Sequence, residues 1–125
     1  MKENITLLYV DDEPINIKIF QAAFRRKYKI VTAQSGHEGL LVLQTNDTID
    51  VVLTDLRMPG MDGIEFIRKA KEQFSDLSYF VLTAYNETRD ISSALDEHLI
   101  QKYFRKPFDF GAIHSAIEEA YAKNA

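Results

Sequence analysis

Short apolar runs alternate along the chain with segments in which apolar residues recur every three or four positions. The runs are rich in β-branched and aromatic residues and lie at residues 5–10, 29–33, 49–54, 79–83 and 103–104. Because runs of this length and composition are typical of strands, the pattern predicts five strands, of which the first is buried on both faces. The periodic segments that follow them predict five helices.

The predicted helices also carry local start and stop signals. Pro14 suits the first turn of a helix, Ser35 and Glu38 have the spacing of a capping box, and Asp109 is placed to cap the last helix. The basic cluster at 25–27 suits a helix C-terminus. The helices are predicted over residues 14–27, 35–45, 64–74, 88–98 and 110–121.

Five alternating strand and helix units favour an α/β fold, in which helices cover both faces of a parallel sheet. The 125 residues match the usual size of one domain, so we expect a single domain over residues 1–125. Open parallel sheets bind their ligands at the carboxyl ends of the strands. A functional site is therefore expected at that edge of the sheet.

Four of the five predicted strands are followed by a reactive polar residue. Asp11 and Asp12 follow the first strand, Asp55 the third, Thr83 the fourth and Lys106 the fifth. Singly, each has an ordinary structural explanation as a helix cap, a turn former, a strand end or a solvated lysine. Their joint placement at one edge of the sheet instead predicts a site. The second strand lacks such a residue, as expected for a strand at the border of the sheet.

The three carboxylates restrict the chemistry of this site. At about 4 to 5 Å they would repel one another by a few kcal/mol per pair, so the site needs a cation. Lys106 offsets one charge and a divalent metal offsets two, and an all-oxygen ligand set favours Mg²⁺ or Mn²⁺. A carboxylate beside such a metal and a lysine can attack phosphorus, and Thr83 could bond the product phosphoryl group. The pattern therefore indicates an aspartyl phosphate.

Composition narrows the class of protein further. The chain has no cysteine, which excludes disulfides and thiolate chemistry, and its net charge of −4 argues against a nucleic-acid binder. The apolar run at 5–10 is too short for a signal peptide or a membrane span, so we expect a soluble cytoplasmic protein. The histidines lie in predicted helices without metal-ligand spacing and are expected at the surface: His37, His98 and His114.

Four motifs resemble those of the receiver domain of two-component response regulators, the chemotaxis-Y-like family. They follow the family's order and span essentially the whole chain: Val10–Pro14, Thr54–Gly63, Leu82–Ala84 and Tyr103–Phe108. The resemblance implies a flavodoxin-like sheet with strand order 2-1-3-4-5. The segment 98–102 lacks the Gly-Ala pair often found in the family, so the turn out of the fourth helix is expected to differ.

The resemblance also implies a metal-binding role for four residues. Asp55 would be the phosphoacceptor and would bind Mg²⁺ together with Asp12. Asp11 would act mainly through a metal-bound water, and the backbone carbonyl of Arg57 would complete the ligands that the protein supplies.

A second group of residues is expected to respond to the phosphoryl group. By the same resemblance, Lys106 and the backbone of Ala84 would contact it, Thr83 would swing toward it, and Tyr103 would rotate inward. The peptide bond before Pro107 would be cis, which would fix the direction of Lys106.

The function implied by the resemblance is a signalling switch and not a turnover enzyme. A histidine kinase or a histidine phosphotransfer protein would phosphorylate Asp55, and the face formed by the fourth helix, fifth strand and fifth helix would change. That face would control a downstream protein or a fused output domain, and it forms homodimers in some family members. The sequence leaves open whether the receiver stands alone or belongs to a longer regulator or hybrid kinase.

Two other functions use related chemistry or the same fold. A haloacid-dehalogenase-like phosphatase also uses an Asp nucleophile, Mg²⁺, a Thr and a Lys, but its general acid is a second Asp where this chain has Arg57. A flavodoxin-like electron carrier needs a phosphate-cradling loop after the first strand, whereas residues 11–13 are acidic here. These two differences favour the signalling switch over the phosphatase and over the electron carrier.

Two bulky residues flank the expected path of attacking water. Arg57 and Tyr85 lie two residues after the predicted phosphoacceptor and the switch threonine, at positions that vary in the family. We hypothesise that they slow loss of the phosphoryl group by hindering that water. The alternative is that both are ordinary solvent-facing side chains.

Overall fold

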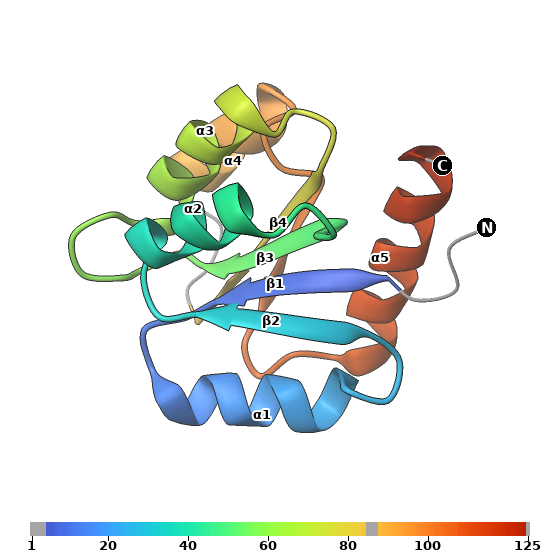
Figure 1. Ribbon diagram of the computed structural model, residues 1–125. Helices are drawn as coiled ribbons and strands as arrows, with labels where there is room; N and C mark the ends of the chain where they lie inside the picture. The colour runs from blue at the N-terminus through green and yellow to red at the C-terminus, as the bar shows by residue number, and fades with distance from the viewer. Residues whose placement is uncertain (1–4, 85–87, 125) are drawn as a thin grey trace.

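The computed structural model describes residues 5–84 and 88–124, in which five strands alternate with five helices (Figure 1). The strands are β1 Thr6–Val10, β2 Lys29–Ala33, β3 Val51–Asp55, β4 Ser78–Thr83 and β5 Lys102–Arg105. The helices are α1 Pro14–Phe24, α2 Gly36–Thr45, α3 Gly63–Gln73, α4 Arg89–Asp96 and α5 Phe110–Asn124. All neighbouring strands are parallel and the order is β2-β1-β3-β4-β5, which confirms the predicted topology.

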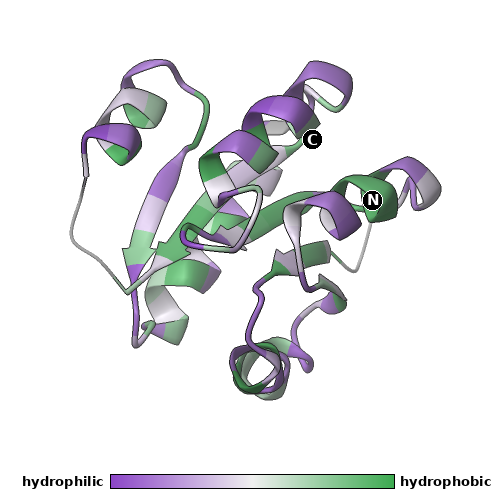
Figure 2. Ribbon diagram, turned by 90° about the vertical axis from the view of Figure 1, so that its left-hand side faces the viewer, coloured by the Kyte–Doolittle hydropathy of each residue, from purple (hydrophilic) through white to green (hydrophobic). Residues whose placement is uncertain are grey.

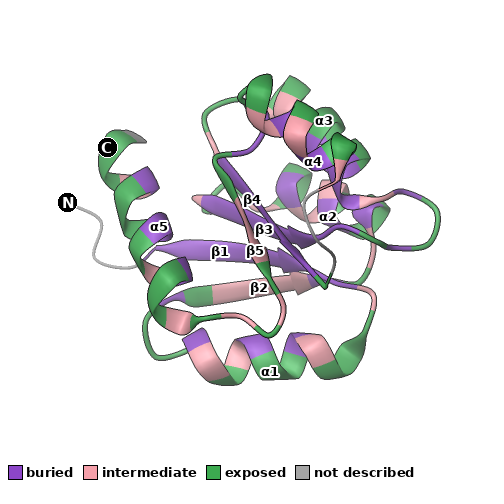
Figure 3. Ribbon diagram, turned by 180° about the vertical axis from the view of Figure 1, so that it is seen from behind, coloured by how far each residue is buried: buried purple, intermediate pink, exposed green. Residues whose placement is uncertain are grey.

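The sheet separates two apolar cores. Helices α2, α3 and α4 cover one face, and α1 and α5 cover the other (Figure 1). The apolar residues of the strands form the centre of the molecule, and the helices turn their polar residues outward (Figure 2). Every residue of β1, β3 and β4 is buried, as predicted for the first strand, whereas the edge strands β2 and β5 are partly exposed (Figure 3).

The strand register brings the predicted site residues to one edge. Val10 pairs with Thr54 across β1 and β3, so the residues that follow, Asp11 and Asp55, are neighbours. Thr83 pairs with Arg105 across β4 and β5. Lys106 then follows directly, and its backbone N–H donates to the carbonyl of Thr83 at 2.8 Å.

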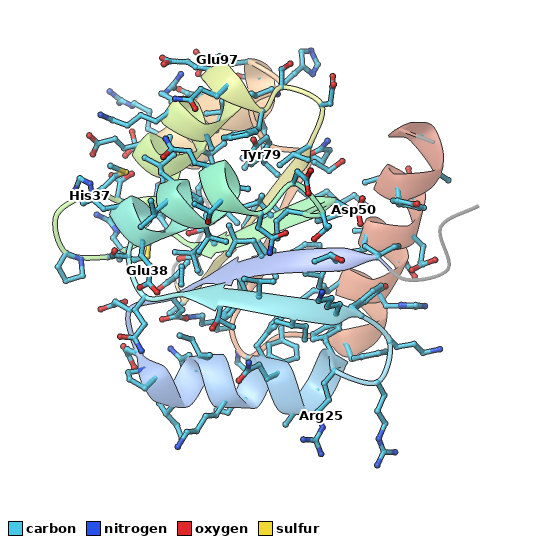
Figure 4. All side chains as sticks on the ribbon, in the orientation of Figure 1. Arg25, His37, Glu38, Asp50, Tyr79 and Glu97 are labelled. Carbon is cyan, nitrogen blue, oxygen red and sulfur yellow. The ribbon has the colours of Figure 1, made fainter. Side chains whose placement is uncertain are left out.

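Side-chain caps fix where α2, α3, α4 and α5 begin, and the cap of α4 is the Thr88 hydroxyl, which accepts from the N–H of Ile91 at 3.3 Å. The Ser35 hydroxyl accepts from the N–H of Glu38 at 3.0 Å, and the Glu38 carboxylate, seen in Figure 4, accepts from the N–H of Gln34 at 2.9 Å. Asp109 accepts from the N–H of Gly111 at 2.9 Å, so both predicted caps are confirmed. Asp62 caps α3 by accepting from the N–H of the third residue of that helix, at 2.9 Å, an interaction that the sequence pattern did not identify.

The predicted end of the fourth helix is wrong. The helix was expected to reach His98, but α4 ends at Asp96 and His98 has a left-handed backbone with φ of 58°. The N–H of Leu99 donates to the carbonyl of Ala94 at 2.8 Å, and the N–H of His98 donates to that of Leu95 at 3.1 Å. This is a Schellman turn, whose left-handed position glycine usually occupies. In this chain a histidine occupies that position.

Replacing this histidine should stabilise the protein. A side chain in the left-handed region costs about 1 to 2 kcal/mol, which glycine avoids at the expense of a more flexible unfolded chain. We expect His98→Gly to raise the free energy of unfolding by about 0.5 to 1 kcal/mol, measured by urea denaturation. His98→Ala keeps the Cβ atom and is the matched control. A His98→Gly variant no more stable than His98→Ala would contradict this explanation.

None of the helices within residues 5–84 and 88–124 is both long enough and apolar enough to cross a membrane.

Candidate functional site

Three carboxylates meet at the carboxyl ends of β1 and β3. Asp11 and Asp12 follow β1 and Asp55 ends β3, and each offers an oxygen within 4.8 Å of the other two. Asp11 is fully buried, Asp55 is 8% exposed and Asp12 is half-buried. The structure thus brings together the three aspartates that the sequence placed at this edge.

Asp11 is held by three donors. Its Oδ2 accepts from the Tyr9 hydroxyl at 2.8 Å and from Lys106 Nζ at 2.9 Å, and its Oδ1 accepts from the N–H of Glu13 at 3.0 Å. Burial and the neighbouring Asp11 carboxylate raise the pKa of the Tyr9 hydroxyl, which stays protonated and able to donate. Tyr9 was not among the predicted site residues. Because alternate strand residues share a face, its position two residues before Asp11 was an available signal.

Lys106 is the ammonium of the site. Its Nζ lies 2.9 Å from Asp11 Oδ2 and 3.6 Å from Asp55 Oδ1, and its side chain is 20% exposed. The following peptide bond, to Pro107, is cis. Lys106 thus contacts two of the three clustered carboxylates, and its single positive charge leaves the site with an excess of negative charge.

The Asp55 carboxyl group is a weaker acid than an ordinary aspartate. Burial raises its pKa from 3.8 to about 6; Lys106 opposes this shift and the Asp11 carboxylate adds to it. The Asp55 Oδ1 accepts from the N–H of Leu56 at 2.9 Å, which fixes the direction of the carboxyl group. The carboxylate is therefore oriented, poorly solvated and close to a cation.

The start of α3 packs directly on the backbone of Asp55. The N–H of Gly63 donates to the carbonyl of Leu56 at 2.8 Å, and a Cβ atom on Gly63 would overlap the carbonyl oxygen of Asp55. The sequence pattern did not identify this contact. Only glycine lets α3 approach the strand end so closely.

The other predicted site residues occupy different surroundings. Thr83 is fully buried at the end of β4, and Ala84 follows it at the surface. Arg57 is exposed, whereas Tyr103 is half-buried and packs against the core beneath α2, α3 and α4. Tyr85 lies outside the residues that the structure describes.

The acidic cluster fits a hard divalent cation. Its donors are all carboxylate oxygens, the ligands that Mg²⁺ and Mn²⁺ prefer, and their negative charge exceeds what Lys106 offsets. The histidines do not join it. His37 and His98 are exposed, and His114 is half-buried with its Nδ1 2.7 Å from the Tyr28 hydroxyl. The expected surface positions of His37 and His98 are therefore confirmed, but His98 lies in the turn after α4 and not in a helix, and His114, in α5, is half-buried.

Comparison with known proteins identifies the family. A model of the response regulator receiver domain matches residues 7–118. The chain belongs to this family of receiver domains. Receiver domains are signalling domains of two-component systems, and their acidic pocket binds Mg²⁺. The resemblance stated from the four motifs is therefore confirmed.

Similar receivers occur both in longer regulators and in short proteins. This receiver is 33% identical over 120 residues to the transcriptional regulatory protein GlrR of Escherichia coli (strain K12), covering 95% of this chain and 27% of GlrR. It is 31% identical over 117 residues to sporulation initiation phosphotransferase F of Bacillus subtilis (strain 168), covering 93% of each. A crystal structure of a receiver domain protein from Clostridium thermocellum matches it with a TM-score of 0.85 at 27% identity, covering 95% of both chains.

Asp55 makes the stability of the metal-free receiver depend on pH. Because its pKa is about 6 when folded against an ordinary 3.8, the folded state binds the proton more tightly than the unfolded state. Stability therefore falls as the pH rises from about 4 to about 7. We expect Asp55→Asn to raise the free energy of unfolding by about 2 kcal/mol at about pH 7 in EDTA, and by much less at about pH 4. Urea unfolding measures both values, and equal gains at the two pH values would contradict this cause.

Proposed function

We propose that residues 1–125 form one receiver domain that acts as a cytoplasmic switch, and that a phosphohistidine protein phosphorylates it on Asp55. The observation that carries the proposal is the placement of Asp55. Its carboxylate is 3.6 Å from the Lys106 ammonium and shares an acidic cluster with Asp11 and Asp12 that fits Mg²⁺. A nucleophile, a cation for the phosphoryl oxygens and a metal site thus lie together.

The transfer step is an in-line displacement at phosphorus. A carboxylate oxygen of Asp55 forms a bond to phosphorus while the bond from phosphorus to the imidazole nitrogen of the donor breaks. The electron pair of that bond remains on the imidazole, which takes up a proton. Lys106 moves toward the negatively charged phosphoryl oxygens as the phosphoryl group approaches Asp55. Mg²⁺ held by Asp12 and Asp55, by Asp11 through water and by the carbonyl of Arg57 would offset the remaining charge.

The donor surface is proposed to include α1 and the loop before α5. Ile15 and Ile19 are 59% and 51% exposed on α1. A groove of about 450 Å³ beside them is lined by Ile19, Phe108 and Lys106, among others. Because the groove opens next to the ammonium that serves Asp55, an apolar surface around a donor histidine could dock there. The partners proposed are a sensor histidine kinase or a histidine phosphotransfer protein.

The response is proposed to reach the α4-β5-α5 face through Thr83 and Tyr103. Thr83 ends β4 next to the backbone of Lys106, and Tyr103 lies on β5 against the core beneath α4. The C-terminal end of α4 is attached to α3 by the Arg68–Glu97 ion pair at 2.7 Å. The N-terminal end of α4, which follows the site, is therefore where we expect the change. A few kcal/mol of differential interaction would shift such an equilibrium.

The output of this switch is a downstream protein or a fused domain. The similarity to GlrR covers 27% of that protein, whereas the similarity to the Bacillus phosphotransferase covers 93% of it, so both arrangements have precedents. The α4-β5-α5 face would also be the contact in a homodimer. The domain would promote its own phosphorylation and dephosphorylation without direct nucleic-acid or membrane binding.

Phosphoryl uptake tests this proposal. The chain is incubated with acetyl phosphate in Mg²⁺ or in EDTA, and its intact mass is measured over time. We expect the gain of one phosphoryl group in Mg²⁺ and none in EDTA, because the acidic site needs the metal to accept a phosphate. Absence of uptake in Mg²⁺, or equal uptake in EDTA, would contradict the proposal.

Arg57 and Tyr85 are expected to set the lifetime of the phosphoryl group. Arg57 is exposed beside the site. If both side chains hinder the attacking water, an Arg57→Ala, Tyr85→Ala double variant should lose phosphate several-fold faster than the wild type. The lifetime is followed by intact mass after removal of the donor, and an unchanged lifetime sinks this hypothesis.

A further inference from the structure

The Tyr9 hydroxyl and the Lys106 ammonium bind the same oxygen atom. Asp11 Oδ2 accepts from both, at 2.8 Å and 2.9 Å. Lys106 is therefore committed to Asp11 in this state, because its distance to Asp55 Oδ1 is longer, at 3.6 Å. If Lys106 approaches a group on Asp55, Asp11 Oδ2 loses the hydrogen bond from Lys106 and keeps the one from Tyr9.

We propose that Tyr9 is a positioning residue that holds the buried Asp11 carboxylate when Lys106 turns to the phosphoryl group on Asp55. This inference rests on the proposed function, since it concerns the step that phosphorylates Asp55. Tyr9 touches neither the phosphoryl group nor the reacting carboxylate in this scheme. It holds the Asp11 carboxylate, and because Lys106 pairs with that carboxylate, it affects Lys106 indirectly.

The burial of Asp11 makes a second donor necessary. Asp11 is 0% exposed, so bulk water does not replace a donor that leaves, and the metal-bound water of the proposed site is the one other donor it would have. A buried carboxylate that loses one hydrogen bond is strongly disfavoured, and this penalty would oppose the movement of Lys106. With Tyr9 present, Oδ2 keeps one donor and Oδ1 keeps the N–H of Glu13 at 3.0 Å.

Packing fixes the Tyr9 hydroxyl in the required direction. The Tyr9 ring is 1% exposed and stacks on the Phe20 ring at a centroid distance of 4.1 Å and an interplanar angle of 3°. Phe20 in turn stacks on Phe24, at 4.5 Å. The ring is thus held by aromatic contacts that a phenylalanine would also make, and only the hydroxyl distinguishes tyrosine at this position.

A second buried tyrosine provides a matched control. Tyr79 is 0% exposed, and its hydroxyl donates to the carbonyl of Phe74 at 2.7 Å. It lies near the start of β4, at the end of the sheet away from the acidic cluster, and is labelled in Figure 4. Tyr79→Phe removes the same group from a comparable environment, so it reproduces a general loss of stability without affecting Asp11.

The rate of phosphorylation tests the inference. Wild type, Tyr9→Phe and Tyr79→Phe are mixed with saturating acetyl phosphate and Mg²⁺, and phosphoryl uptake is timed. We expect about tenfold slower uptake in Tyr9→Phe, the effect of one charge-assisted hydrogen bond, and a change within about twofold in Tyr79→Phe. A wild-type rate in Tyr9→Phe, or an equal loss in both variants, overturns the inference. If the wild type itself takes up no phosphate, it is the proposed function that fails.

A spectroscopic measurement reports on the Tyr9 hydroxyl in the wild-type chain itself, and the variants serve only to assign the resonances. With ¹³Cζ-labelled tyrosine, the Tyr9 and Tyr79 resonances are assigned by their absence in the two variants. Addition of Mg²⁺ and beryllofluoride, a phosphoryl analogue, should shift the Tyr9 resonance because Lys106 leaves the shared oxygen. The Tyr79 resonance should stay in place. A Tyr9 resonance that does not move overturns the inference.

Discussion

Asp55→Asn is expected to abolish phosphoryl uptake completely. The amide of asparagine has nearly the shape of the carboxyl group but is not a nucleophile toward phosphorus, so the bond to phosphorus cannot form. Unfolding cannot cause this loss, because removal of the buried charge should make the variant more stable at neutral pH. Uptake from acetyl phosphate, measured by intact mass, gives the result directly.

Asp50→Asn is the matched control for this substitution. Asp50, labelled in Figure 4, directly precedes β3, and Asp55 is the last residue of that strand. Its Oδ2 accepts from the N–H of Thr6 at 2.9 Å, and the amide oxygen of asparagine can accept in the same way. This variant should be phosphorylated at the wild-type rate. Uptake by Asp55→Asn comparable with that of Asp50→Asn would contradict the assignment of the phosphoacceptor.

Gly63→Ala is expected to produce the largest loss of stability. The added Cβ atom would overlap the carbonyl oxygen of Asp55 and lie 3.1 Å from the Cα atom of Leu56, both of which are backbone atoms. Because the backbone cannot move aside as a flexible side chain can, α3 must shift away from β3. We expect the free energy of unfolding to fall by about 2 to 4 kcal/mol, measured by urea denaturation.

Gly111→Ala provides the comparison. At Gly111, in α5, a Cβ atom would meet only Asp109 Oδ1, at 3.4 Å, and alanine favours a helix more than glycine does. This variant should be as stable as the wild type or more stable. Gly63→Ala should also slow phosphorylation, because the displaced contact lies on the backbone of the phosphoacceptor. Equal stabilities of the two alanine variants would refute the close approach of α3 to Asp55.

The sequence pattern was sufficient for the class of fold and most of its elements because local and long-range requirements agree, whereas the strand order was implied by the family resemblance. The buried strands read as continuous apolar runs, and the helices show apolar periodicity and caps such as Ser35 and Asp109. The fourth helix was predicted too long because its periodicity continues past Asp96. Its actual end depends on a left-handed His98, whose carbonyl accepts from Lys71 Nζ on α3 at 2.6 Å. A contact between residues this far apart leaves no local signal.

The candidate site was predictable where strand ends alone define it. The strand register brings together Asp11, Asp12 and Asp55, with Lys106 beside them. The residues that form hydrogen bonds with this cluster were harder to predict from the sequence. The position of Tyr9 places it on the same face as Asp11, but its hydrogen bond to Asp11 is established only by their distance in the structure. The same holds for His114, which the fold places against Tyr28 although 86 positions separate them. Hydrogen bonds made across the core depend on packing that periodicity does not encode.

Mapping the phosphoryl group on the wild-type chain tests the central claim most directly. The chain is phosphorylated with acetyl phosphate and Mg²⁺, reduced with borohydride to trap the acyl phosphate, digested and sequenced by mass spectrometry. The proposed mechanism predicts modification of Asp55 alone, in the peptide that carries the acidic end of β3. Modification of another residue in place of Asp55, or no modification of any peptide, would contradict it.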